Sequence, residues 1–153
     1  MRRILLAAAG FLFVAPAQAQ IGFAPLVGYD FDYEAPTVGL AFELPLTPGI
    51  LPLQASIRPS AEYIFVDSDG ASAFRVAGDL IGRFRAPGVP FAPYGKAGVV
   101  VERISVDVGS ESDSNTEIGL GIGAGAAFDR FFVEGTIGIG DISNSRIAVG
   151  YQF

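Results

Sequence analysis

The stretch Glu117-Ile118-Gly119-Leu120-Gly121-Ile122-Gly123-Ala124-Gly125-Ala126-Ala127-Phe128 places an apolar residue at every even position up to Ala126 and a glycine or glutamate at every odd position up to Gly125. Successive side chains of a β-strand point to opposite faces, so a period of two indicates a strand with two different faces. An amphipathic helix would instead repeat its apolar residues at intervals of three and four. The segment is therefore predicted to be a β-strand with one apolar face.

The same period of two recurs in seven further segments. Their approximate ranges are 21–33, 38–46, 51–65, 74–85, 91–102, 131–139 and 147–153. Pro48-Gly49, Pro87-Gly88 and Asp129-Arg130 mark turns between them, residues 103–115 form the longest expected loop, and the Val99-Val100-Val101 triplet predicts a bulge. We expect about eight antiparallel strands of roughly ten residues, the length with which a tilted strand crosses a membrane.

The apolar face of each predicted strand carries no charged residue. Its aromatic residues lie at the strand ends and would form two girdles around an aliphatic band. With the first strand taken as running upward, the upper girdle comprises Tyr29, Phe31, Tyr33, Tyr63, Phe65 and Phe74, and the lower girdle comprises Phe84, Phe91, Phe128, Phe131, Tyr151 and Phe153. Such girdles are typical of a wall that faces lipid. The alternative is a soluble barrel or sandwich, which would turn its apolar faces inward.

The opposite faces of the predicted strands carry five basic and six acidic residues. They are Arg58, Arg75, Arg83, Arg85, Lys96, Glu43, Glu62, Asp79, Glu102, Glu117 and Glu134. Enclosed charges are tolerated when they are paired and hydrogen-bonded, so we predict an ion-pair network inside the barrel. Eight strands enclose a space that side chains just fill. We expect a plugged lumen in which the glycines at 119–125 leave room for arginines from across the barrel, with an open conduit as the alternative.

Residues 1–19 have the three parts of a secretory signal peptide: the positive start Met1-Arg2-Arg3, an apolar run to about Ala15, and a small-residue end at Ala17-Gln18-Ala19. Cleavage after Ala19 would leave a single barrel domain at 20–153. A transmembrane anchor is the alternative, but the apolar run is shorter than the ~20 residues that span a bilayer as a helix. The short turns expected after the second, fourth and sixth strands place both barrel termini in the periplasm.

Composition excludes several function classes. The 153 residues carry a net charge of −6 and contain neither Cys nor His. Zinc and copper sites, thiol chemistry and His-based triads therefore lack their usual residues, and we expect no metal and no cofactor. The acidic balance, with Lys96 as the single lysine, also argues against nucleic acid as a partner, because phosphate binding needs a basic surface.

The closing segment 147–153 resembles the terminal signal of Gram-negative outer-membrane barrels, with Val149, Tyr151 and Phe153 at its alternating apolar positions. Pro93-Tyr94-Gly95-Lys96-Ala97-Gly98-Val99 is similar to the Pro-Tyr, Gly-rich fifth strand of the outer membrane protein A/X-like superfamily. The resemblance implies an all-β fold, an eight-stranded antiparallel transmembrane up-and-down β-barrel in the outer membrane. It also implies contact with outer-membrane lipids and lipopolysaccharide, assembly by the barrel-assembly machinery and periplasmic chaperones, and a monomeric chain.

These observations favour a non-enzymatic integral barrel with a structural or surface-interaction role. The alternatives are a narrow porin-like channel or conduit for small apolar molecules, an envelope enzyme, and a soluble periplasmic carrier of the lipocalin type. Lipid-modifying barrels of the resembling family use His-containing sites, which this chain lacks. Glu117 and Glu134 would need an open cleft to act as a glycosidase pair.

Two other motifs partly resemble ligand-binding sequences, but we expect both to have a structural role only. The two-residue spacing of Gly119 to Gly125 does not match a dinucleotide fingerprint. The segment Asp67-Ser68-Asp69-Gly70 lacks the closing acid of a calcium loop, so we expect a solvated turn there.

Overall fold

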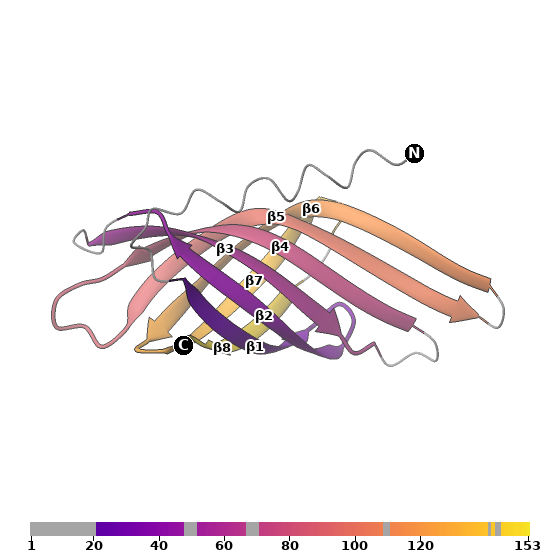
Figure 1. Cartoon of the computed structure of the whole chain (residues 1–153), viewed down its shortest axis with the longest axis horizontal. Coiled ribbons are helices and arrows are strands. Elements are labelled where there is room, and N and C mark those ends of the chain that lie inside the picture. Colours follow the sequence, from indigo (N-terminus) through magenta and orange to yellow (C-terminus); the bar gives the residue numbers. More distant parts are fainter. Residues whose placement is uncertain (1–20, 48–51, 67–70, 109–110, 141, 143–144) are drawn as a thin grey trace.

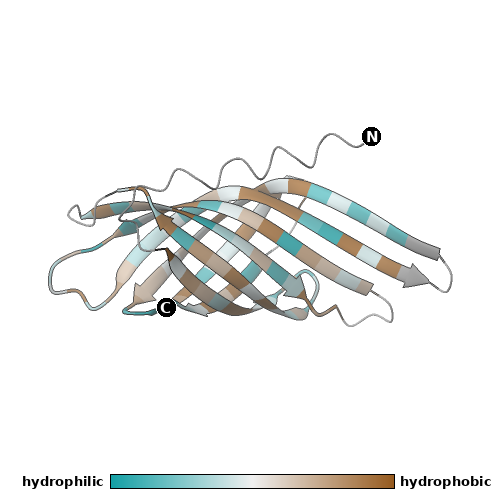
Figure 2. Cartoon of the chain, in the orientation of Figure 1, coloured by the Kyte–Doolittle hydropathy of each residue, from teal (hydrophilic) through white to brown (hydrophobic). Residues whose placement is uncertain are grey.

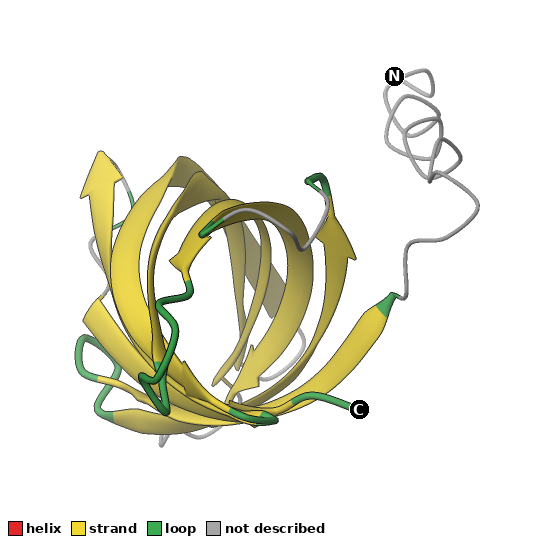
Figure 3. Cartoon of the chain, turned by 90° about the vertical axis from the view of Figure 1, so that its left-hand side faces the viewer, coloured by secondary structure: helices red, strands yellow, loops and turns green. Residues whose placement is uncertain are grey.

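The computed structural model describes residues 21–47, 52–66, 71–108, 111–140, 142 and 145–153. The predicted signal peptide at 1–19, the turn at Pro48-Gly49 and the turn at 67–70 lie outside the described residues. The strands are β1 (Gly22–Asp30), β2 (Ala35–Pro45), β3 (Leu53–Ile64), β4 (Ala71–Phe84), β5 (Ala92–Val108), β6 (Glu111–Phe128), β7 (Phe131–Gly140) and β8 (Ser145–Tyr151). Each strand pairs with the next in the chain, and β8 pairs with β1, so the sheet closes into a barrel (Figures 1 and 3).

Closure confirms the predicted eight-stranded antiparallel barrel. The β1–β8 seam runs from Leu26 opposite Gly150 to Asp30 opposite Arg146. A closed sheet leaves no free edge along the paired part of its wall, so its backbone N–H and C=O groups are hydrogen-bonded within the sheet. A β-structure can be stable in the hydrocarbon of a membrane only under this condition. Beyond the strands, the backbone N–H of Phe153 donates to the carbonyl of Phe23. The end of the chain and the start of β1 therefore lie at the same end of the barrel.

No helix in the described residues is long and apolar enough to cross a membrane.

The predicted bulge at Val99-Val100-Val101 is wrong. The register of β5 is continuous through all three residues on both sides, with Val100 opposite Ala77 of β4 and Gly119 of β6. Val100 points into the lumen and packs with Ala77 and Ile142. An apolar residue is accepted on the inner face there because Gly121 of β6 has no side chain: a β-carbon added to it would lie 3.0 Å from Val100 Cγ2.

The loop expected at 103–115 is also wrong. β5 continues to Val108, and its partner β6 begins at Glu111, so the two strands form a long hairpin that reaches beyond the other strands of the barrel (Figure 1). In Figure 2 the protruding part of β6 alternates between hydrophilic and intermediate colours. Both faces of a strand outside a membrane can meet water, so this segment lacks the apolar alternation by which the other strands are recognised.

The outer wall of the barrel is apolar. Large aliphatic side chains are exposed on several strands, including Leu80 of β4 at 56%, Leu120 of β6 at 55% and Ile137 of β7 at 53%. Aromatic pairs lie at both ends of this band. Ring centroids are 5.0 Å apart for Tyr63 and Phe65 at one end, and 4.8 Å apart for Phe131 and Tyr151 at the other. The apolar faces therefore point outward, as a lipid-facing wall requires.

Tyr33 is an exception to the predicted upper girdle. It follows β1 in a turn and folds inward, where it packs against the cluster formed by Ala35, Ile64 and Ala73. The alternation that places Tyr29 on the outer face ends with the strand at Asp30. Beyond that point the turn, and no longer the pleat, decides where the side chain goes.

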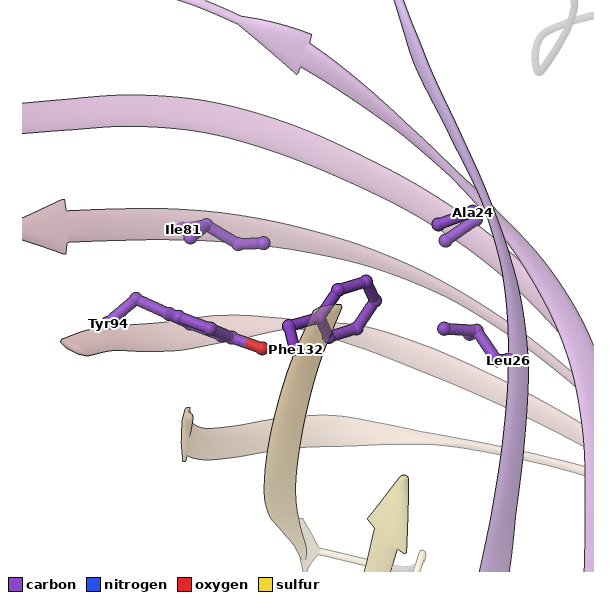
Figure 4. Packing of buried hydrophobic residues seen from close by; sticks show 6 residues of the cluster. Ala24, Leu26, Ile81, Tyr94 and Phe132 are labelled. Atoms are coloured by element: carbon purple, nitrogen blue, oxygen red, sulfur yellow. The ribbon is translucent and has the colours of Figure 1, made fainter. Parts of the chain in front are cut away.

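Small apolar clusters lie at both ends of the interior. The cluster with Tyr33 occupies one end. At the opposite end, Tyr94 and Phe132 pack with smaller side chains (Figure 4); the other members are Ala24, Leu26, Ala41 and Ile81. Glu43 and Arg83 come two positions after Ala41 and Ile81 and lie nearer the mouth of the barrel, whereas Arg75 and Asp79 come before Ile81 and lie further inside.

Candidate functional site: the ionic interior of the barrel

Glu134 of β7 is the centre of the ionic interior. It accepts hydrogen bonds from Arg58 Nη1 at 2.7 Å, Lys96 Nζ at 2.6 Å and the Tyr94 hydroxyl at 2.8 Å. Arg146 Nη2 lies 3.5 Å from the same carboxylate. The donors come from β3, β5 and β8, so this one side chain links distant parts of the wall.

Arg58 extends the network toward the end of the barrel that carries the chain termini. Its Nη2 lies 2.9 Å from Glu43, which also accepts from Arg83 Nη2 at 3.1 Å and from the Ser56 hydroxyl at 2.8 Å. The guanidinium carbon of Arg58 lies 4.5 Å from the centre of the Phe132 ring. The cation is thus held by two carboxylates and by the face of an aromatic ring.

Arg146 connects this region to the opposite end of the barrel. In addition to Glu134, it binds Glu62, which lies 4.0 Å from Arg75 Nη1. The second carboxylate oxygen of Glu62 and the Nη1 atom of Arg75 are both buried and, at this distance, have no hydrogen-bond partner among the described residues. This long ion pair is the weakest link in the network.

Arg75 holds the far end together. Its Nη2 lies 2.6 Å from Asp30, and its Nε and Nη2 both donate to Glu102, at 2.9 and 2.7 Å. The hydroxyl of Tyr33 also donates to Glu102. Burial and the neighbouring Glu102 carboxylate raise the pKa of Tyr33, which lies outside the strands. The phenol therefore remains a neutral donor across the ordinary pH range.

The network joins five cations and six anions in the described residues. They are Arg58, Arg75, Arg83, Lys96 and Arg146, with Asp30, Glu43, Glu62, Asp79, Glu102 and Glu134. The side chains of Lys96 and its partner Asp79, 3.0 Å apart, are only 1% and 3% exposed. Charges this deeply enclosed are stable only with such partners, because desolvating an unpaired ion is costly.

The structure brings most of the predicted inward charges into this network and leaves out two. Arg85 lies one residue beyond β4 and is exposed at the mouth of the barrel. Glu117 is half-buried and accepts from Asn115 at 3.0 Å. It stands opposite Glu102 near the start of the protruding hairpin. Both were predicted to be lumenal because the alternation places them on the inner face, but that face continues past the enclosed part of the barrel.

Two members of the network were not predicted. Asp30 and Arg146 face each other across the seam between β1 and β8. The alternation could have found both, because Asp30 is on the even face of the segment 21–33, and Arg146 precedes the last predicted strand in the same phase as Ala148 and Gly150.

The inward glycines of β6 do not make room for arginines from across the barrel. A β-carbon added to Gly125 would lie 2.5 Å from Tyr94 Cζ, and one added to Gly123 would lie 3.2 Å from Lys96 Cε. Tyr94 and Lys96 come from β5, the adjacent strand, where they stand opposite these two glycines. The glycines therefore allow the donors of Glu134 to lie flat against the neighbouring wall.

The interior offers little for chemistry on a substrate. The described residues contain no group of three or more acidic, His or Cys side chains arranged to hold a metal. Glu134 is 3% exposed and bound by cations, whereas Glu117 lies outside the network.

The outward apolar residues of the closing segment run along the wall: Val149 is 45% exposed and Phe153 is 70% exposed.

The closed antiparallel sheet with an apolar exterior is the fold of the small outer-membrane barrels. The N-terminal β-barrel domain of Pseudomonas aeruginosa OprF is similar to this chain, with a TM-score of 0.65 and 20% identity over 89% of this chain and all (100%) of that domain. Neisserial surface protein A matches with a TM-score of 0.53 and 16% identity, covering 88% of this chain and 96% of its own.

The outer membrane enzyme PagL also shares the fold, with a TM-score of 0.55 and 16% identity over 86% of this chain and 98% of its own. At these identities the likeness is one of fold, and because PagL is an enzyme, the fold itself does not exclude catalysis. No protein-family model and no curated protein matches the sequence.

Proposed function

We propose that the protein is a non-enzymatic integral barrel of the outer membrane, with a structural or surface-interaction role. The observation that carries this proposal is the division of the wall into an apolar outer face and an inner face filled by a linked ionic network. Neighbours in fold that are outer-membrane proteins support the location. In this role outer-membrane lipids and lipopolysaccharide contact the aliphatic band.

The proposed orientation places the chain ends in the periplasm and the β5–β6 hairpin outside the cell. It is supported by the two-residue turn at Asp129-Arg130 beside the chain ends and by the length of the hairpin at the opposite end. The hairpin is then the part best placed for contacts with other molecules. We further propose that Val149, Tyr151 and Phe153 present the outward row that assembly factors read, and that the folded barrel is a monomer.

A narrow channel or apolar conduit is the less favoured role. The enclosed side chains of Arg75 and Glu134 and the apolar clusters at both ends leave the described lumen filled. Planar-bilayer recordings test this directly, and a steady conductance would favour the channel. An enzymatic role is disfavoured because the chain has no His and its interior carboxylates are occupied by cations.

The orientation of the wall is tested by Leu120→Arg, compared with Thr116→Arg on the same face of β6. Leu120 is exposed within the apolar band, so an arginine there should cost roughly 2–4 kcal/mol in a bilayer. Thr116 stands opposite the natural Arg103 near the base of the hairpin, so the control should be nearly neutral.

Unfolding in lipid vesicles, followed by the mobility difference between folded and boiled protein on a gel, measures both variants. Equal stability of Leu120→Arg and the parent protein, or a barrel that stays soluble and folded without detergent, would contradict the proposal.

A further inference from the structure

A hollow opens at the end of the barrel that carries the chain termini. It has a volume of about 330 Å³ and is lined by side chains of β2, β3 and β4 together with Gln152, which follows β8. Most of its polar lining residues carry hydrogen-bond donors, among them Thr47, Ser56 and Gln152. The hollow lies below the ionic network that fills the lumen, and the proposed structural role does not use it.

Two arginines make this hollow electropositive. Arg83 is the last inward residue of β4, Arg85 follows one residue after the end of the strand, and both line the hollow. The acid in the lining, Glu43, is already bound by Arg58 at 2.9 Å as well as by Arg83 at 3.1 Å. Arg85 forms no ion pair with any acid of the described residues. Two lining cations against one shared carboxylate leave an excess of positive charge.

Arg83 also has a hydrogen-bond donor that no acceptor among the described residues satisfies. The residue is 8% exposed, and its side chain uses Nη2 on Glu43. Its buried Nε has no hydrogen-bond partner in the part of the chain that the structure describes. A buried donor without an acceptor is unfavourable, and an anion in the hollow would supply the acceptor oxygen that Arg83 Nε lacks.

We propose that this hollow binds a phosphate group. Two guanidinium groups offer planar forks of N–H donors, which match the oxygen atoms of a phosphate. A tetrahedral anion presents enough acceptor oxygens to be shared between Arg83 and Arg85 while also meeting a hydroxyl or amide of the lining. A carboxylate holds its two oxygens in one plane, so it reaches fewer of these donors than a phosphate group, whose terminal and ester oxygens point in tetrahedral directions.

The position of the hollow admits two sources of that group. Arg85 directly follows Phe84, an exposed aromatic residue of the lower girdle, so its side chain lies at the level where lipid headgroups begin. The phosphate can belong to a phospholipid headgroup of the adjacent leaflet. It can also belong to a free phosphate compound in the aqueous compartment, which reaches the mouth of the barrel from below.

The test is a titration of the protein purified in dodecyl maltoside, which contains no phosphate. Inorganic phosphate is added in one arm and phosphatidylglycerol in mixed micelles in the other, and the arginine Nε–Hε signals are followed by NMR. Saturable shifts of the Arg83 and Arg85 signals are expected in at least one arm, and the arm that saturates identifies the source. Acetate at the same ionic strength should bind more weakly.

Arg85→Gln is the decisive variant because the side chain is exposed and the network does not use it. It should weaken phosphate binding by about tenfold, as expected for the loss of a charge-assisted hydrogen bond. The matched control is Arg130→Gln, which removes another exposed arginine at the same end that lines a different hollow. Absence of saturation in both arms, equal binding of acetate, or equal weakening by both substitutions would overturn the proposal.

Discussion

Replacing Glu134 with glutamine separates two explanations of how the charged interior is stabilised. Glutamine keeps the shape of the side chain but removes the charge that faces Arg58, Lys96 and Arg146, at 2.7, 2.6 and 3.5 Å. If only the overall charge mattered, the variant would be stabilised, because the network would change from five cations and six anions to five of each. If specific pairing matters, the variant is destabilised.

The structure allows the size of the effect to be worked out. Removing one partner of a buried ion pair costs about 3–5 kcal/mol, because it leaves the other charge without compensation. Here each cation keeps a second carboxylate: Arg58 keeps Glu43, Lys96 keeps Asp79, and Arg146 keeps Glu62. We therefore expect a loss at the lower end of that range, about 3 kcal/mol.

Urea unfolding of the barrel in lipid vesicles, monitored by the gel mobility of the folded form, measures this loss. Glu117→Gln is the matched control, since it makes the same chemical change at a half-buried site outside the network. Its effect should stay within about 0.5 kcal/mol. A Glu134→Gln barrel as stable as the control, or more stable than the parent, would refute the pairing argument.

Two further outcomes follow from single contacts. Gly125→Ala should destabilise the barrel by about 1–3 kcal/mol in the same unfolding assay, because the new methyl group would lie 2.5 Å from Tyr94 Cζ. The control is Gly95→Ala, which should have little effect because no atom lies within 4 Å of the new methyl group. Equal effects of the two substitutions would contradict the packing described. Burial and the adjacent Glu102 carboxylate raise the pKa of Tyr33 in the folded barrel. The stability that its neutral phenol contributes is therefore present below 10.0, the ordinary pKa of a tyrosine, and is lost as the pH rises above that value. The stability advantage of the parent over Tyr33→Phe should therefore shrink between about pH 9 and pH 11, and an advantage that grows with pH would show that the phenol ionises more readily in the folded barrel.

Local backbone geometry makes the two faces of each strand readable from the sequence. Leu80 and Ile137 are exposed on the outer wall, and Arg75 and Glu134 are enclosed, as alternation alone predicts. This holds because neighbouring side chains on a strand must point to opposite sides, whatever the strand pairs with. The same rule could have placed Asp30 and Arg146 inside.

The rule does not extend beyond the ends of the strands or of the enclosed lumen. Tyr33 lies in a turn and folds inward to Glu102, and Arg85 passes out of the lumen at its mouth. The β6 arm of the protruding hairpin, residues 111–116, shows no apolar alternation, because both faces of a strand beyond the apolar band can meet water. In each case the outcome depends on where the enclosed part of the barrel ends, and the sequence of a single strand does not give that position.

The sequence by itself determined the strands, their facing and the presence of paired charges inside. Only the tertiary structure decided which charges meet. Arg58 and Glu134 are 76 positions apart, and Arg146 and Glu62 are 84 apart. Their contacts depend on the register of every strand and on the closure between β1 and β8, which set the height of each side chain around the barrel. Alternation specifies the direction of a side chain, but that height is a property of the closed sheet as a whole.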